Sequence, residues 1–140
     1  MRRLPQYRRV RAAPQHPVFR PRIHIPPLWG PDSFNDGAGM ARLITIANFV
    51  HFNMPHGTEY LDPQLTSEEA WDVAAYVVSQ PRPSRADSAH DFPDLLEKPV
   101  DTPYGPYADS FSEEQHKYGP FAPIRAEIRR LTEDHQRDSR

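Results

Sequence analysis

The side chains best suited to bind a metal gather in the stretch HFNMPHG, residues 51 to 57. It holds two imidazoles, His51 and His56, and one thioether, Met54. A thioether is a soft metal ligand, but methionine also commonly fills gaps in protein cores. The two histidines are five residues apart across Pro55, which is a poor spacing for a shared metal site. The sequence leaves two interpretations of Met54 open, a ligand or an ordinary core side chain.

Other chemistry is sparse. The chain has no cysteine, which rules out disulfides, thiolate zinc sites and thiol nucleophiles. It has no nucleophile-elbow motif and no P-loop. Helix capping accounts for the acidic pair Glu68 and Glu69. The pair Glu113 and Glu114 is expected in the polar tail, with both carboxylates in solvent. We therefore expect no catalytic constellation.

The charge is unevenly distributed. Of the 17 lysines and arginines, seven arginines lie in residues 1 to 22, which leaves ten against all 19 acidic residues in the rest of the chain. A basic arm suggests either a disordered tail or a nucleic-acid contact, but no nucleic-acid motif accompanies it, so no nucleic-acid partner is predicted. No apolar run reaches about 18 residues, so we expect no membrane span. The first residues also lack the apolar core of a signal peptide.

Two helices must position Met54. Helical apolar spacing predicts the first over about residues 38 to 53, and Pro55 ends it, so Met54 lies where the chain leaves the helix. The second is predicted over about residues 67 to 79, with a capping box between Thr66 and Glu69. Its expected apolar stripe, with small members that let another helix approach closely, consists of Ala70, Val73, Ala74 and Val77.

The flanks are rich in proline. Residues 1 to 31 contain seven prolines and residues 80 to 123 contain eight. The second stretch is typical of an extended tail laid over a surface, and residues 123 to 134 predict a short surface helix. The fold class is therefore mostly α, with a long irregular C-terminal tail. The expected aromatic and apolar anchors of that tail are Phe92, Leu95, Tyr104, Tyr107, Phe111, Tyr118 and Phe121.

Four blocks carry a resemblance to a known family. In chain order they are PPLWGPDSFNDGAGM, ANFVHFNMPHG, SEEAWDVAAYVVSQPRP and KPVDTPYGPYADSFSEEQHKYGPFAPI. Together, over about residues 26 to 124, they resemble the C-terminal haem domain of c-type cytochromes of the thiosulfate dehydrogenase type. The resemblance implies a partial cytochrome c-like domain over residues 26 to 80 and a wrapping tail over residues 81 to 140.

The resemblance also implies a cofactor, haem c, and a site. Met54 corresponds to the axial iron ligand, and Pro27, Trp29, Phe49 and Asn53 are the expected cofactor-binding residues. The implied function is periplasmic electron transfer in sulfur oxidation, with a redox partner protein or a neighbouring haem domain. The parent family oxidises thiosulfate to tetrathionate, but we do not expect this chain to be an enzyme by itself.

The sequence departs from the family at its start. The Cys-x-x-Cys-His motif that attaches haem is missing, so we expect a truncated domain unable to attach haem covalently. Substitute nitrogen ligands would be His24, His51, His56 or His116, each expected at the surface or in a loop, or Lys98. For His51 we expect a solvent-facing position rather than one in a haem crevice. The alternative is a haem-free remnant that serves as a structural or interaction module.

The first 25 residues suggest an explanation for this departure. Codons for residues 1 to 6, written ATG CGN CGN CTN CCN CAR and read one base later, permit Cys-x-x-Cys-His. We therefore hypothesise that residues 1 to 25 are a frame-displaced translation of the haem-attachment region. We expect this irregular segment to form no packed helix.

Overall fold

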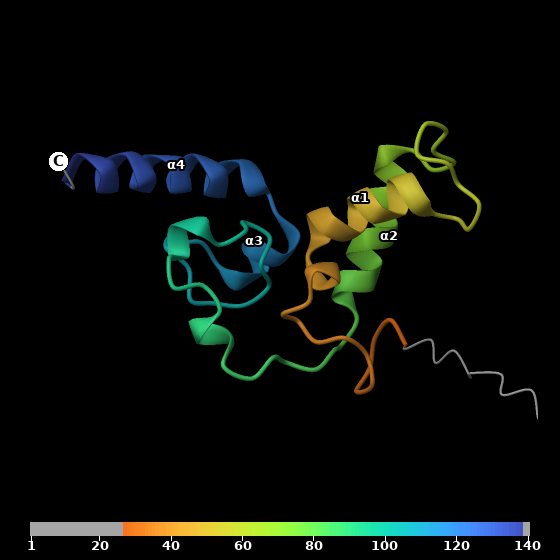
Figure 1. Ribbon diagram of the computed structural model, residues 1–140, viewed down its shortest axis with the longest axis horizontal. Helices are drawn as coiled ribbons and strands as arrows, with labels where there is room; N and C mark the ends of the chain where they lie inside the picture. The colour runs from red at the N-terminus through yellow and green to blue at the C-terminus, as the bar shows by residue number, and fades with distance from the viewer. Residues whose placement is uncertain (1–26, 139–140) are drawn as a thin grey trace, which may run out of the picture.

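The computed structural model describes residues 27 to 138, which form helices and no strand. The mostly α fold class is therefore confirmed (Figure 1). None of the helices in this part of the chain is long and apolar enough to cross a membrane. The predictions made for residues 1 to 25 lie outside the described residues. The α-helices are α1 (Leu43–Asn53), α2 (Ser67–Ser79), α3 (Glu113–Tyr118) and α4 (Phe121–Asp138), and short 3-10 helices span Gly39–Ala41, Ser88–His90 and Leu95–Glu97.

The first predicted helix is split in two. The backbone is extended at Arg42, with φ −96° and ψ 131°, between the 3-10 turn Gly39–Ala41 and α1. The reason is a cap from far along the chain: the Ile44 amide donates to Asp101 Oδ2 at 3.0 Å. Arg42 Nη1 lies 3.5 Å from Asp101 Oδ1. An N-terminal amide of a helix has no partner within the helix, so the Asp101 carboxylate fixes where α1 begins.

Helix α2 begins and ends where the sequence predicts. The Glu69 amide donates to Thr66 Oγ1 at 3.2 Å, and the Thr66 amide donates to Glu69 Oε2 at 2.8 Å. This reciprocal pair is the predicted capping box. The helix ends at Ser79, two residues before Pro81.

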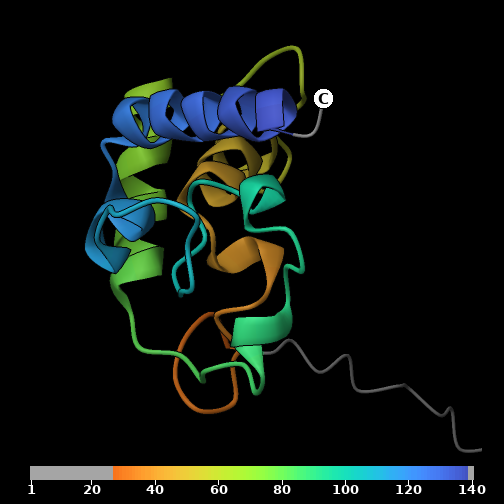
Figure 2. The ribbon, with the colours of Figure 1, turned by 90° about the vertical axis from the view of Figure 1, so that its left-hand side faces the viewer.

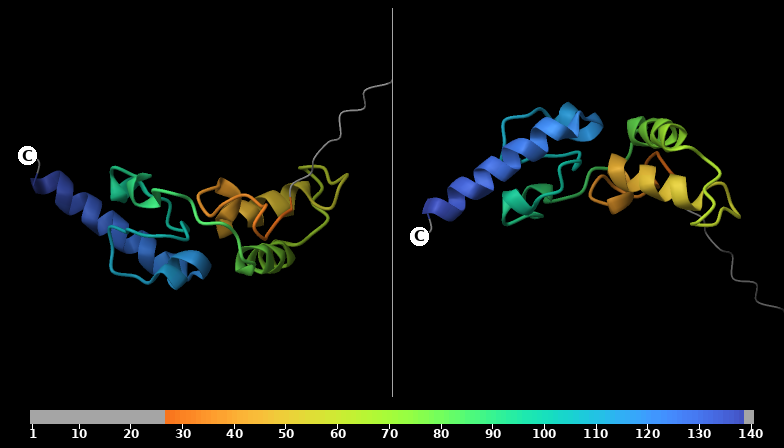
Figure 3. Two further views of the ribbon diagram at one scale, coloured as in Figure 1. Left: turned by 90° about the horizontal axis from the view of Figure 1, so that it is seen from below. Right: turned by 90° about the horizontal axis from the view of Figure 1, so that it is seen from above.

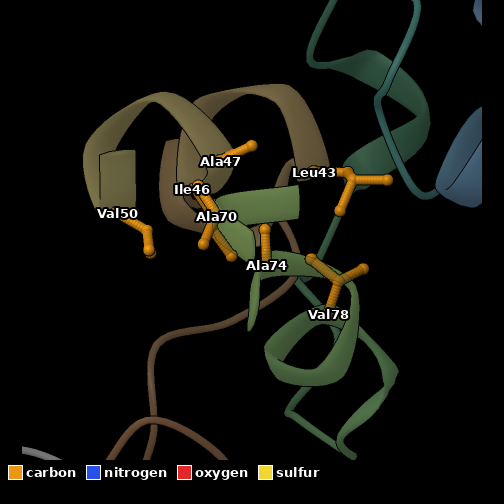
Figure 4. Close-up of a cluster of buried hydrophobic side chains, with 7 residues drawn as sticks. All are labelled: Leu43, Ile46, Ala47, Val50, Ala70, Ala74 and Val78. Atoms are coloured by element: carbon orange, nitrogen blue, oxygen red, sulfur yellow. The ribbon is translucent and has the colours of Figure 1, made fainter. Parts of the chain in front are cut away.

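The core lies where α1 and α2 cross (Figure 4). Ala74 is 0% exposed, and its small side chain lets the two backbones approach closely. The buried stripe of α2 follows residues four apart, a common ridge in helix packing, so Val78 is buried and the expected member Val73 is exposed. The core residues are Leu43, Ile46, Ala47 and Val50 from α1 and Ala70, Ala74 and Val78 from α2.

The C-terminal part is more regular than the sequence suggests. It lies beside the α1–α2 pair, and α4 extends away from that pair (Figures 2 and 3). Helix α3 was not expected, and α4 is longer than the predicted span of residues 123 to 134. Pro123 is tolerated because it lies in the first turn. Arg130 pairs with Glu127 at 2.6 Å and with Asp134 at 3.0 Å, which supports the later turns.

Several predicted aromatic anchors surround a buried lysine. Lys98 Nζ donates to the carbonyl oxygens of Tyr104, at 2.7 Å, and Pro106, at 2.8 Å. It lies over the rings of Phe92, Tyr104 and Tyr107, 4.7 to 5.5 Å from their centroids. Cations are attracted to aromatic faces, so this segment folds around an ammonium group as well as around apolar side chains.

Candidate functional site

Met54 lies at the C-terminal end of α1 and is partly exposed. Its amide donates to the Val50 carbonyl at 3.0 Å, the last hydrogen bond of the helix, and its own backbone is extended. The side chain is 42% exposed and is not part of the buried cluster. Its backbone is thus held by the helix, while its side chain lies outside the buried core.

Two groups of exposed apolar side chains flank the α1–α2 pair. Phe49 is exposed near the end of α1, like Met54. Trp29 packs edge to face on Tyr76 of α2, with ring centroids 6.1 Å apart, and both rings remain partly exposed. The Gly30 amide donates to the Pro81 carbonyl at 2.7 Å, which ties the Trp29 loop to the end of α2. Exposed apolar groups of this kind often mark binding surfaces.

The other predicted cofactor-binding residues fall in different places. Asn53 belongs to the last turn of α1, and its side-chain amide donates to the Phe49 carbonyl at 3.0 Å. Pro27 is exposed at the start of the described residues. The structure therefore brings Phe49, Asn53 and Met54 together at one helix end, whereas Trp29 contacts Tyr76.

His51 is half-buried rather than open to solvent. Its ring lies edge-on to Phe52, with centroids 4.5 Å apart, and Phe52 stacks on Tyr60 at 4.6 Å. His51 Nδ1 is buried and has no hydrogen-bond partner among the described residues. The expectation of a solvent-facing ring is therefore wrong for Nδ1, which is buried, while the ring contacts that of Phe52.

His116 is deeply buried, which contradicts the prediction of a surface histidine. It is 2% exposed and belongs to α3. Its Nδ1 lies 2.8 Å from the Val100 carbonyl, and its Nε2 lies 3.1 Å from Asp109 Oδ1. The ring also stacks on Tyr107, with centroids 3.6 Å apart. Both ring nitrogens are engaged by protein atoms, so His116 is not free to bind a metal.

Burial shifts the pKa of several groups in the C-terminal part, among them Tyr104 and Lys98. The pKa of Tyr104 rises to about 12 because of burial, its hydrogen bond to Asp91 and the charge of that carboxylate. Its hydroxyl donates to Asp91 Oδ2 at 2.7 Å. Burial lowers the pKa of Lys98, while Asp91 and Glu113 oppose the shift. Their contacts stabilise the folded C-terminal part. The sequence analysis did not predict that Lys98, Tyr104 and Asp101 would be buried polar residues.

The main cavities lie away from Met54. One of about 300 Å³ lies between the end of α2 and α3, and its charged lining residues are Asp36, Arg82, Glu113 and Lys117. Because opposite charges alternate there, it favours neither an anion nor a cation. Residues 27 to 138 contain no group of three or more His, Cys, Asp or Glu placed to hold a metal ion.

Comparison with known proteins gives a relation for part of the chain. It is similar to thiosulfate dehydrogenase from Allochromatium vinosum, 55% identical over 62 residues, or 44% of this chain and 22% of that protein. It is also similar to the thiosulfate dehydrogenases of Thiomonas intermedia, 52% identical over 59 residues (42% of this chain, 18% of that protein), and Psychrobacter arcticus, 44% identical over 68 residues (49% and 20%).

The relation is thus to thiosulfate dehydrogenases, as the sequence blocks predict. The matched stretch spans about a fifth of the length of these relatives. No family model and no solved structure matches the chain.

Proposed function

We propose that this chain is a cytochrome c-like electron-transfer domain related to thiosulfate dehydrogenase, in which Met54 is the axial thioether ligand of a haem iron. The observation that carries the proposal is the position of Met54. Its backbone is held by the Val50 carbonyl at the end of α1, and its side chain, like that of Phe49 in the same helix, is partly exposed. In the proposed organisation, residues 26 to 80 form the cytochrome-like part and residues 81 to 140 wrap against it.

The residues around Met54 have separate roles in this proposal. A thioether ligand raises the reduction potential of haem iron. The exposed ring of Phe49 would offer apolar surface to a haem bound at Met54, whereas Trp29 packs on Tyr76 of α2 and would contribute a second exposed ring. Asn53 holds the last turn of α1 closed through its bond to the Phe49 carbonyl, and Pro27 precedes the Trp29 loop.

The donor set fits one axial position of haem but not covalent attachment. Thioether bonds to haem c require cysteines, and the chain has none. This misfit agrees with the hypothesis that residues 1 to 25 are frame-displaced. It also favours the second candidate function, a haem-free structural or interaction module. An absorption spectrum of the purified chain separates the two, because bound haem gives intense visible bands.

The proposed role extends to location and partners. By relation to thiosulfate dehydrogenases, we propose a periplasmic protein of sulfur oxidation that exchanges electrons with a redox partner protein or a neighbouring haem domain. Without a catalytic constellation of its own, the chain would pass electrons rather than oxidise thiosulfate.

The decisive experiment restores haem attachment. Residues 1 to 25 are replaced by a segment containing Cys-x-x-Cys-His, and the protein is expressed with an export signal and haem-attachment machinery. Met54→Leu, which keeps the volume and removes the sulfur, should retain covalent haem. It should lose the sulfur–iron band of the oxidised spectrum, and the reduction potential should fall.

The matched control is Met40→Leu, because Met40 packs against the core of α1 and α2. It should leave both the spectrum and the potential as they are. An unchanged band and potential in Met54→Leu would show that Met54 is not the ligand.

A further inference from the structure

The loop that joins α1 to α2 carries two large apolar side chains at its tip. The Asp62 amide donates to the Glu59 carbonyl at 3.0 Å, which closes a turn. Tyr60 and Leu61 occupy the two central positions of this turn, which we call the Tyr60–Leu61 turn. Leu61 is 91% exposed, more than any other large apolar residue among those described, and Tyr60 is 67% exposed. The loop projects at the end of the molecule opposite to the end of α4 (Figures 1 and 3).

The Tyr60–Leu61 turn is held in one orientation by its neighbours. The ring of Tyr60 stacks on that of Phe52, the penultimate residue of α1, with centroids 4.6 Å apart. The Thr58 amide donates to the Pro55 carbonyl at 3.0 Å, which orders the chain between the helix and the turn. A group that is already ordered loses less conformational freedom when a partner docks, and tyrosine is frequent at the energetic centre of interfaces. The turn is therefore well prepared to bind.

The charge around this turn has one sign. Residues 43 to 81 contain no lysine or arginine, whereas residues 82 to 138 contain eight. Their five carboxylates are all exposed, and none pairs with a lysine or arginine in the described part of the chain. In the C-terminal part, by contrast, Glu127 pairs with Arg130 at 2.6 Å. The five unpaired acidic residues, on the loop and the first two turns of α2, are Glu59, Asp62, Glu68, Glu69 and Asp72.

We infer that the Tyr60–Leu61 turn is a docking surface for a separate basic protein, whose contact face has an apolar centre bordered by lysine or arginine. Charge complementarity selects this partner, because carboxylates around an apolar centre attract a positive surface and repel a negative one. The same field speeds the encounter, most strongly at low salt. The inference goes beyond the proposed function and does not depend on Met54 binding a haem, since the chain alone forms the turn, its stacking contact and its charges.

The test uses the full chain and a fluorescent helical peptide that has leucines along one face and lysines along both borders of that face. Fluorescence anisotropy should show saturable binding that weakens as NaCl is added, because salt screens exposed charges. The peptide should shift the backbone amide resonances of residues 58 to 73. Peptides with glutamate in place of lysine, or with serine in place of leucine, should not bind. Binding of the glutamate peptide with equal affinity overturns the inference.

Substitutions at the turn separate its apolar and charged contributions. Leu61→Ala should weaken binding about tenfold, which corresponds to about 1.4 kcal/mol, and should leave the circular dichroism spectrum unchanged because the side chain is exposed. Glu59→Gln combined with Asp72→Asn spares the capping box and should weaken binding at least about threefold at low salt, since exposed ion pairs are individually weak. The matched controls, Leu28→Ala and Glu114→Gln, remove an exposed leucine and an exposed carboxylate elsewhere and should bind like the unchanged chain. Unchanged affinity in Leu61→Ala overturns the inference.

Two other occupants of the surface would also overturn it. If the chain sediments as a dimer that Leu61→Ala dissociates, the occupant is a second copy. Replacing the seven arginines of residues 1 to 22 by glutamine should leave the resonances of residues 58 to 73 in place without peptide. If they move, the occupant is the basic arm of the chain itself. All these measurements are made without haem, so their failure is distinct from failure of the proposed role of Met54.

Discussion

Replacing Asp101 by alanine tests how far the C-terminal part supports the Met54 helix. Asp101 is 3% exposed; its carboxylate accepts from the Ile44 amide at 3.0 Å and pairs with Arg42 at 3.5 Å. Loss of a helix N-cap costs about 0.5–2 kcal/mol. Arg42 is 31% exposed, so loss of its partner adds about 1 kcal/mol or less, as for exposed ion pairs. We expect Asp101→Ala to lower the free energy of unfolding by about 1–3 kcal/mol.

The assay is urea unfolding followed by far-ultraviolet circular dichroism. Asp101→Asn keeps one acceptor oxygen and should recover part of the loss. The control is Glu127→Gln on α4, which removes an exposed ion pair with Arg130 and should leave the urea midpoint nearly unchanged, because exposed ion pairs contribute little to stability. If Asp101→Ala unfolds at the same urea concentration as the unchanged chain, the start of α1 does not depend on this cap and our reasoning is wrong.

Three further predictions concern the buried groups. Lys98→Met should lower the free energy of unfolding by about 2–4 kcal/mol, because the carbonyls of Tyr104 and Pro106 lose a charged donor. Thermal and urea unfolding would measure this loss, and unchanged stability would contradict the prediction. The raised pKa of Tyr104 means that its contribution to stability is fully present below pH 10.0, its ordinary pKa, and is lost as the pH rises through about 12. Phenolate absorbance in a pH titration should show this late ionisation, and Tyr104→Phe should reduce its amplitude, since Tyr107, whose pKa is also raised by burial, still ionises late. Ala74→Leu should cost about 1–3 kcal/mol by overpacking the helix crossing, measured by urea unfolding, whereas Ala126→Leu on the exposed side of α4 should be nearly neutral.

The parts of the fold that the sequence predicts well depend on local signals. The bounds of α2 follow from Thr66, Glu69 and the nearby Pro81, all within a few residues of the helix ends. The position of Met54 at the end of α1 follows from Pro55 in the same way. Such signals act through backbone hydrogen bonds and steric limits, so they need no knowledge of the rest of the chain.

The parts that the sequence does not predict depend on distant contacts. The break at Arg42 exists because Asp101 caps α1 from 57 positions away. Lys98 looks like a surface residue because lysine is rarely buried unless it is paired, and histidine is intermediate in burial, so its type alone does not place His116. Only the folded tail supplies their acceptors and aromatic neighbours. Val73 was expected in the core because it lies in the apolar stripe of α2. The sequence does not show which side of that stripe faces α1, and in the folded chain the side with Ala70, Ala74 and Val78 does.

The cap from Asp101 also affects when, during synthesis of the chain, helix α1 can become fully formed. Helices α1 and α2 emerge from the ribosome before Asp101 does, and segments nearer the N-terminus generally fold first during synthesis. Until Asp101 emerges, the nascent chain has a helix pair whose first turn lacks its acceptor and can fray. The last step of assembling the Met54 helix therefore waits for translation to proceed well beyond that helix, and a chain released early would carry Met54 on an incompletely anchored support.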